Sequence, residues 1–402
     1  MRYNLNMTSI LKENRNILVF YILSACMNFF FLASNWIYFW TKFMTYGQLG
    51  WIDALGFGFA LFLEIPSGAI ADLLGKKKTI QVGLIAGTIG AFMISGANNL
   101  TTIFIGWLMV QIAYAFYSGA GEALAYDTLV QLKRENEYDV VITKSKTIET
   151  YTTAFATFFG GFMYEFWFRL PHYAWGFGFL LGAISAFWLF EPKVDTIKFS
   201  FKTYFEQLFI GAKELFSVSL RKYVVFILIL LGVYYLYSWG FIRPAIATSF
   251  GFYAKEQSII IGLLTLISAF AIRLVPKLRE KISDMGGLVI LSLMMAIGFF
   301  AAAFPIGYWG VFVLLTIAIA GKLADPWISV VINREIPSKY RATTLSTAAF
   351  ITRLPYVLIA VVAGSSIQAG KLSIFNLWVA GAILLGIFLS FFLYKLRKVK
   401  AL

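Results

Sequence analysis

Five ionisable residues stand inside long apolar stretches of this sequence. They are three acids and two bases: Glu64, Glu122, Lys322, Asp325 and Arg353. A charged group among apolar side chains is costly, so such groups face a protein interior or a water-filled cavity, where they bind ions, protons or polar solutes. A carboxylate withdrawn from water also binds a proton more readily. Glu122 is therefore our first choice for a proton-binding residue, and Glu64 is the second.

The composition offers little support for other chemistry. The chain has one cysteine, Cys26, and one histidine, His172, so we expect neither an internal disulfide nor a cysteine or histidine metal cluster. The sequence contains no His-Glu-x-x-His pattern and no phosphate-binding Gly-x-x-x-x-Gly-Lys-Ser/Thr loop. We therefore predict a protein that is not an enzyme and that uses no cofactor.

The elements that position the five charges are long apolar segments. The chain is 60% apolar and 13% charged, with a mean hydropathy of +0.77. A soluble domain is about 45–50% apolar and about 25% charged, so we predict an all-α integral membrane protein. We expect twelve transmembrane helices at 17–41, 51–73, 79–97, 101–130, 147–168, 173–190, 223–248, 257–275, 286–304, 307–332, 342–368 and 373–394.

The net charge of +14 is explained by the topology of these spans. Most lysines and arginines fall in alternate connections and at the two ends of the chain. The other connections hold only Lys42, Arg169, Arg243, Lys255 and Lys371. By the positive-inside rule both termini are cytoplasmic. We thus predict a multi-pass protein of the cell membrane (plasma or inner membrane) with no nucleic-acid partner.

The twelve spans divide into two halves. The longest polar connection, 192–221, has apolar residues at helical spacing and is expected to form an amphipathic linker helix on the membrane surface. It separates residues 1–191 from residues 222–402, which we expect to form two six-helix bundles. An offset of 200 residues pairs Ala69 with Ala269, Lys77 with Lys277, Gly121 with Gly321, Arg134 with Arg334 and Glu135 with Glu335. A parallel repeat of this kind is one of the known plans of transporters.

The segment 68–78, GAIADLLGKKK, carries a family resemblance. Gly68, three residues, Asp72, and then Gly75 followed by Lys76 resemble the signature between spans 2 and 3 of the major facilitator superfamily. The position in the chain, the twelve spans and the repeat are similar to that family as well. The resemblance implies two helical bundles that rock about a central cavity. We expect the protein to be a monomer in the lipid bilayer.

The resemblance also implies a role for the signature. Asp72 would cap the start of span 11 near Arg341, and Lys76 would pair with Asp127 at the cytoplasmic end of span 4. Such contacts would form a latch that closes the cytoplasmic side and breaks when the protein opens inward. The alternative is that the lysines 76–78 only determine topology. The second-half counterpart of the signature is degraded, so we expect an asymmetric latch.

The mid-membrane charges are predicted to line the cavity. Glu122 precedes Arg134 by twelve residues, which places it about 18 Å from the cytoplasmic end of its helix at 1.5 Å per residue. At a similar depth lie Glu64, Lys322, Asp325 and Arg353. Two alternatives remain open: Lys322 and Asp325 could pair with each other, and Glu64 could be a structural acid.

Polar and aromatic residues in spans 1 and 7 are further candidates. Asn28, Asn35, Tyr234 and Tyr237 stand in aromatic-rich segments of spans that border the cavity in the family. They could contact a solute by hydrogen bonds or stacking. Aromatic residues of this kind could equally face lipid or lie in the interfacial belt.

These patterns predict a secondary transporter that moves a small solute by alternating access, coupled to protons. A drug/proton antiporter is an alternative, because span 5 keeps the glycine pair of the exporter signature, Gly160 and Gly161, although it lacks the Gly-Pro that precedes the pair. A non-transporting receptor or partner protein on a transporter fold is the alternative from another class.

Overall fold

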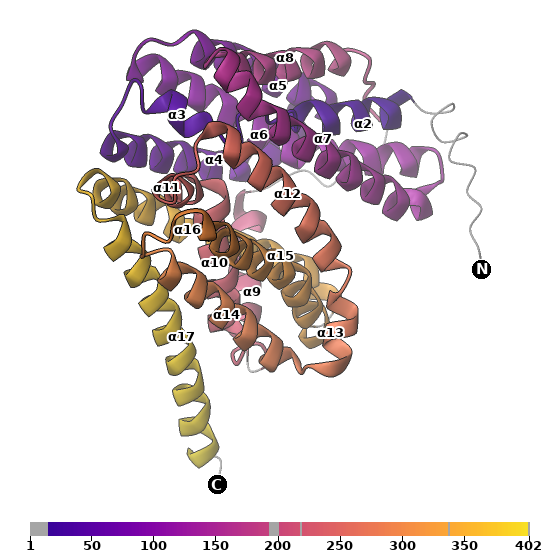
Figure 1. The fold of residues 1–402 in the computed structure, drawn as a ribbon. Helices are drawn as coiled ribbons and strands as arrows, with labels where there is room; N and C mark the ends of the chain where they lie inside the picture. The colour runs from indigo at the N-terminus through magenta and orange to yellow at the C-terminus, as the bar shows by residue number, and fades with distance from the viewer. Residues whose placement is uncertain (1–14, 193–200, 218, 337, 401–402) are drawn as a thin grey trace. The chain divides into compact units, whose positions relative to one another are not determined.

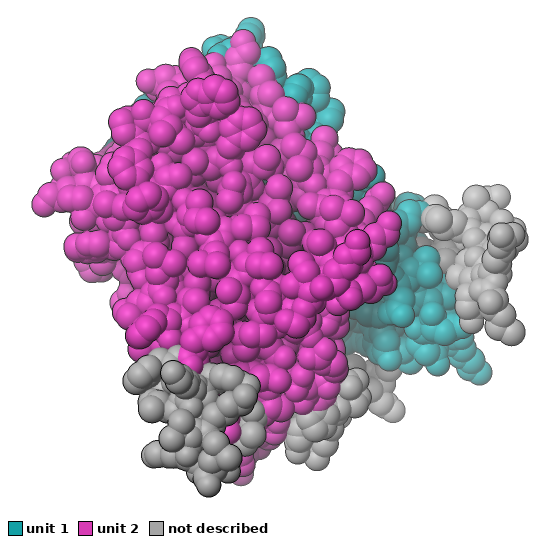
Figure 2. Space-filling model, turned by 60° about the horizontal axis from the view of Figure 1, so that its bottom comes forward, with its two compact units in different colours: residues 1–43, 56–201 teal, residues 44–55, 202–402 magenta. Residues whose placement is uncertain are grey.

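The computed structural model describes residues 15–192, 201–217, 219–336 and 338–400. Within these ranges the chain is helical and contains no β-strand (Figure 1). The chain forms two compact units, which are coloured separately in Figure 2. Unit 1 comprises residues 1–43 and 56–201, and unit 2 comprises residues 44–55 and 202–402. Residues 44–55 thus group with unit 2, although the sequence placed them in the first bundle.

Unit 1 is built from long helices connected by short turns. Its elements are α2 (Arg15–Met27), α3 (Trp36–Trp40), α4 (Tyr46–Leu74) from residue 56 onward, α5 (Lys76–Gly96), α6 (Leu100–Gln131), the 3-10 turn η1 (Glu135–Glu137), α7 (Tyr138–Phe166) and α8 (Leu170–Ala186).

Small residues let the helices of unit 1 approach closely. α5 packs against α6 and α8. A Cβ added to Gly90 on α5 would lie 2.4 Å from the carbonyl oxygen of Gly106 on α6. Glycine pairs of this kind allow backbone contact between membrane helices, where van der Waals packing and not the hydrophobic effect favours association.

The first predicted span is broken. The range 17–41 was expected to be one helix, but α2 ends at Met27 and α3 begins at Trp36. Gly160 on α7 lies against the break, since a Cβ there would come within 1.8 Å of the carbonyl oxygen of Phe31. The helix is therefore interrupted where α7 packs closely against it. The apolar composition of 17–41 did not indicate this break.

Helix α7 begins earlier than the sequence suggested. It starts at Tyr138 and not near residue 147, so Lys144 and Lys146 are helical residues and do not belong to a cytoplasmic loop. The Lys144 ammonium lies over the ring of Tyr21 on α2, 4.9 Å from its centre. Because the segment is polar, its hydropathy resembles that of a loop, whereas its backbone continues the helix.

Unit 2 contains the linker helix and the second half of the chain. Its elements are α9 (Phe201–Leu215), α10 (Val224–Trp239), α11 (Ile242–Ser249), α12 (Ala254–Ile272), α13 (Val275–Lys281), α14 (Asp284–Ala301), the 3-10 turn η2 (Gly307–Trp309), α15 (Gly310–Glu335), α16 (Ser338–Gln368) and α17 (Leu372–Lys400).

Two features of unit 2 matter for the site. α10 and α11 form a pair that is bent by 68°. The start of α4 packs on α16, where a Cβ added to Gly50 would lie 2.6 Å from the carbonyl oxygen of Ala360 and 3.2 Å from Cα of Gly364. This glycine contact is the physical reason why residues 44–55 group with unit 2.

Helices occupy parts of all twelve predicted ranges. By length and composition, seven of the described helices could cross a membrane, or eight if the bent pair of α10 and α11 forms one span. With 13 and 17 residues, α2 and α8 are shorter than the about 20 residues that a straight span needs. The count of twelve spans and the cytoplasmic location of both termini therefore remain predictions.

Candidate functional site

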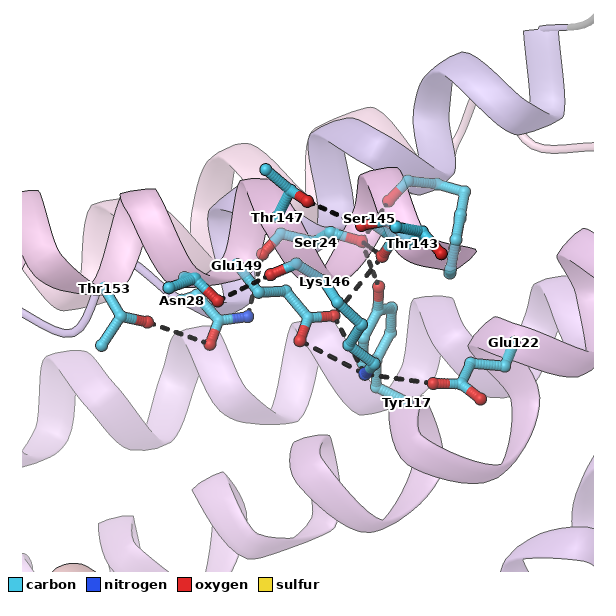
Figure 3. A network of polar contacts seen from close by, with 12 residues as sticks. Ser24, Asn28, Tyr117, Glu122, Thr143, Ser145, Lys146, Thr147, Glu149 and Thr153 are labelled. Carbon is cyan, nitrogen blue, oxygen red and sulfur yellow. Dashed lines mark hydrogen bonds and ion pairs between the residues drawn. The ribbon is translucent and has the colours of Figure 1, made fainter. Parts of the chain in front are cut away.

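A lysine shared by two acids forms the centre of a polar network in unit 1 (Figure 3). Nζ of Lys146 on α7 lies 3.1 Å from Oε1 of Glu122 on α6. The same ammonium lies 3.2 Å from Oε2 of Glu149, one turn further along α7. The spacing of three residues puts Lys146 and Glu149 on one face of their helix, where they meet α6.

Neutral hydrogen-bonding groups extend this network to α2. Ser145 bonds to the hydroxyl of Ser24 at 2.7 Å, and Ser24 lies 3.5 Å from the hydroxyl of Tyr117 on α6. Beyond Ser24, the hydroxyl of Thr153 on α7 donates to the side-chain oxygen of Asn28 at 3.4 Å. Side chains from three helices therefore offer donors and acceptors around the charges, as Figure 3 shows.

The charges of the network are unbalanced and accessible. Two carboxylates face one ammonium, so the cluster of Lys146, Glu122 and Glu149 carries an excess of negative charge. The side chains are 57%, 46% and 23% exposed, respectively. Both signs of charge in this cluster are therefore open to solvent. Glu122 was predicted from the sequence. Lys146 was missed because the start of α7 was assigned to a loop, and Glu149 was missed although it lies in the predicted span 147–168.

The two asparagines of span 1 lie at opposite ends of the break. Asn28 follows the last residue of α2 and donates to the carbonyl oxygen of Ser24 at 2.9 Å. Asn35 is fully buried, precedes α3 and donates to the carbonyl oxygen of Phe31 at 2.9 Å. Asn28 thus joins the network around Lys146, while Asn35 holds the backbone of the break. Contact of either residue with a solute stays a prediction.

Glu64 lies in the part of α4 that belongs to unit 1 and is half-buried. Its backbone carbonyl accepts the hydroxyl of Ser67 at 2.9 Å. The predicted choice between a cavity acid and a structural acid remains open.

The other predicted cavity residues lie in unit 2. Lys322 and Asp325 on α15 are both described, both exposed, and form no ion pair with each other. The pairing that was the alternative role for these two residues is therefore not present. Arg353 on α16 lies over the ring of Tyr235, 5.7 Å from its centre. That these charges share one cavity with Glu122 and Glu64 is a prediction.

The tyrosines of α10 differ in their surroundings. Tyr237 is 1% exposed, and its hydroxyl donates to the carbonyl oxygen of Leu314 on α15 at 3.1 Å. Tyr234 is half-buried, and its ring covers Gly321, where an added Cβ would come within 1.9 Å. Both residues join α10 to α15, and contact with a solute stays a prediction for both.

The predicted latch pair is present in unit 1. The ammonium of Lys76, at the start of α5, forms an ion pair with Asp127 near the end of α6, and the two side chains are 12% and 13% exposed. This is the partner that the family resemblance implied for Lys76. The role of the pair as a latch stays a prediction. At the other latch positions, Gly68, Asp72 and Arg341, the side-chain environment lies outside the described part of the structure.

A second acid, missed in the sequence, completes this end of unit 1. The carboxylate of Glu191 accepts the backbone N–H groups of Lys76 and Lys77, both at 2.8 Å. It therefore caps the N-terminus of α5, where unpaired N–H groups favour an anion. Gly75 makes room for it, with a φ of +89° and an added Cβ that would lie 2.9 Å from Oε2 of Glu191.

Unit 2 has its own ion network at the corresponding end. Asp284, the first residue of α14, accepts the guanidinium of Arg279 on α13 at 2.8 Å and that of Arg334 on α15 at 2.5 Å. Arg334 also pairs with Glu335 at 2.8 Å. The signature is degraded at the positions offset by 200 residues, and the second half has ion pairs between different residues. Among the described residues, no three His, Cys, Asp or Glu side chains come together as metal ligands.

A family model described as the Major Facilitator Superfamily matches residues 17–360 of this chain. The chain belongs to the Major Facilitator Superfamily. The family and the fold are those of secondary transporters, so the protein is a multi-pass membrane protein with a transporter fold.

Solved structures of the superfamily have the same fold. The nucleoside transporter NupG matches with a TM-score of 0.74 and 16% identity, over 95% of this chain and 98% of that chain. A D-xylose-proton symporter matches with a TM-score of 0.61 and 13% identity, over 95% of each chain. Identities this low show the fold alone.

One curated relative is similar in sequence. Protein SGE1 of Saccharomyces cerevisiae is 26% identical over 149 residues, which is 36% of this chain and 25% of that protein. The match therefore spans about a quarter of the length of the curated relative.

Proposed function

We propose that this protein is a proton-coupled secondary transporter of the cell membrane, which carries a small polar or anionic solute by alternating access. The observation that carries the proposal is the position of Lys146 between Glu122 and Glu149, at 3.1 and 3.2 Å. A nucleoside transporter and a D-xylose-proton symporter of the same fold support polar solutes and protons as cargo.

The coupling follows from the charge balance of this cluster. When both acids are ionised, the Lys146 ammonium is paired with two carboxylates and attracts an anionic solute only weakly. A proton on Glu122 removes one of these attractions and leaves the ammonium available to a solute. Solute and proton then favour each other's binding, as coupled binding requires. The hydroxyls of Ser24 and Tyr117 and the side chain of Asn28 would supply hydrogen bonds to a polar solute.

Proteoliposomes with a trapped pH-sensitive dye would test this function. Nucleosides, pentoses, dipeptides and small carboxylic acids would be added in turn, and proton entry would be recorded together with uptake of the labelled compound. We expect one class to drive proton entry in the wild type. In Glu122→Gln we expect exchange of the same labelled compound across the membrane to persist without proton movement. If no class moves either protons or label, the proposed function is wrong.

A further inference from the structure

Asp53 on α4 is a buried acid outside the network described above. It belongs to the part of α4 that packs in unit 2, and its exposed fraction is 2%. The hydroxyl of Tyr356 on α16 donates to its Oδ2. No lysine, arginine or histidine among the described residues forms an ion pair with Asp53. A buried carboxylate that is held by one neutral donor has no counter-charge.

The surroundings of this pair are equally enclosed. Tyr356 is 2% exposed, and its hydroxyl lies at the bend between α10 and α11, where a Cβ added to Gly240 would come within 2.1 Å of it. The ring of Tyr235 on α10 meets the ring of Tyr356 edge-on at 5.5 Å, and the guanidinium of Arg353 lies over the ring of Tyr235. Arg243 follows Gly240 by three residues at the start of α11. In the described part of the chain, neither Arg243 nor Arg353 forms an ion pair with Asp53.

The contact between α4 and α16 leaves little room for water near the acid. One turn before Asp53, Gly50 packs directly on the backbone of Ala360 and Gly364. One turn earlier again, the side chain of Gln368 accepts the backbone N–H of Gly47 at 2.8 Å. An ionised carboxylate in such a place is costly unless it is paired, whereas a neutral carboxylic acid needs only hydrogen bonds.

We propose that Asp53 is a proton-binding residue, which is protonated while α4 and α16 are in contact and ionised once they separate and water reaches it. The reaction is the binding of one proton from water to a carboxylate oxygen, with the Tyr356 hydroxyl bonded to the other oxygen. The proposal rests on the proposed function, because a proton-coupled transporter needs a link between protonation and helix movement. It adds a second proton-binding residue to Glu122, at the end of α4 that the predicted topology places outside.

Infrared spectroscopy on the full-length protein without solute tests the protonation directly. A pH titration from about 9 to about 5 reports protonated carboxylic acids through their C=O stretching band. We expect the wild type to show a band that is absent in Asp53→Asn and shifted in Tyr356→Phe. Glu280→Gln, at an exposed acid, is the control and should keep the band unchanged. A wild-type band that survives in Asp53→Asn overturns the proposal. If Asp53→Asn does not fold, the proposal is overturned by a C=O band that is not shifted in Tyr356→Phe.

Crosslinking tests the link to helix movement. Gly47→Cys and Gln368→Cys, in a Cys26→Ser background, place one thiol on α4 and one on α16. With a short bis-maleimide we expect severalfold more crosslinking at acidic than at alkaline pH, and no such dependence after Asp53→Asn. A dependence that persists in Asp53→Asn overturns the proposal. Neither the infrared nor the crosslinking measurement uses a solute. A negative result for Asp53 can therefore be distinguished from a protein that does not transport.

Discussion

Lys146 on α7 and Glu122 on α6 form an ion pair of 3.1 Å in unit 1. Both side chains are about half exposed, and accessible pairs contribute only about 0–1 kcal/mol to folding. The pair is therefore of little use as a structural bond. Its position fits the proposed coupling, in which a proton binds Glu122 and a solute then binds Lys146.

Replacing Lys146 should separate function from stability. We expect Lys146→Gln to reduce solute uptake at least about tenfold, because a hydrogen bond to a charged group contributes about 1.5–3 kcal/mol. The melting temperature should change little, since the side chain is 57% exposed. Uptake of the labelled solute by proteoliposomes and thermal unfolding in detergent measure the two effects. Lys146→Arg keeps the charge and should retain part of the uptake. Normal uptake by Lys146→Gln would contradict a role for Lys146 in solute binding.

The pair of Lys76 and Asp127 should stabilise unit 1. Lys76→Met and Asp127→Asn should each lower the melting temperature, because each leaves a largely buried charge without its partner, at a cost of about 1–3 kcal/mol. The double variant should lose less than the sum of both, with a coupling of at least about 0.5 kcal/mol. Lys78→Met, at an exposed neighbour, is the control and should be close to neutral. Additive effects would show that the two side chains act independently.

Gly75 should be intolerant of a methyl group. Its positive φ of +89° strains any other residue, and an added Cβ would press on the Glu191 carboxylate. We expect Gly75→Ala to cost about 1–3 kcal/mol, as residues held in disfavoured backbone conformations do. Thermal unfolding measures the change. Gly96→Ala, at the other end of α5, is the matched control, because its Cβ would meet only the hydroxyl of Tyr173 at 3.6 Å. Equal effects at the two glycines would disprove the crowding at Gly75.

Asp284 should matter more to unit 2 than either arginine that it binds. Asp284→Asn weakens the contacts of α14 with Arg279 and with Arg334 at once, whereas Arg334→Gln removes only one of them. We expect the larger fall in melting temperature for Asp284→Asn, and the difference should persist at high salt, because the Arg279 and Asp284 side chains are only 19% and 7% exposed and such pairs are screened little. Glu280→Gln, on the exposed face of α13, serves as the control. A larger effect of Arg334→Gln would show that its pair with Glu335 is the stronger contact.

The sequence predicted the class of structure because hydropathy depends on composition alone. Apolar stretches, basic connections and the segment from Gly68 to Lys76 pointed to a helical membrane protein of this superfamily, and the family match agrees. The family resemblance also implied Asp127 as the partner of Lys76, and the two side chains form that ion pair.

Contacts between distant segments could not be predicted in this way. The break after Met27 lies in a segment as apolar as a helix, and it became visible only where Gly160 of α7 packs against Phe31. The start of α7 has the polarity of a loop, so Lys146 was assigned to a connection. Nothing near Asp53 in the chain indicates that its carboxylate meets the hydroxyl of Tyr356, 303 residues away.

The sequence by itself thus determined that the chain is a helical membrane protein with a transporter fold, because burial in lipid requires apolar residues and internally paired backbone groups in every span. Only the tertiary structure decided which charged groups meet. The partners of Lys146, Gly75 and Asp53 come from other helices, and their approach depends on side-chain packing and on small residues far away in the chain. The composition of a segment does not indicate which distant residues pack against it.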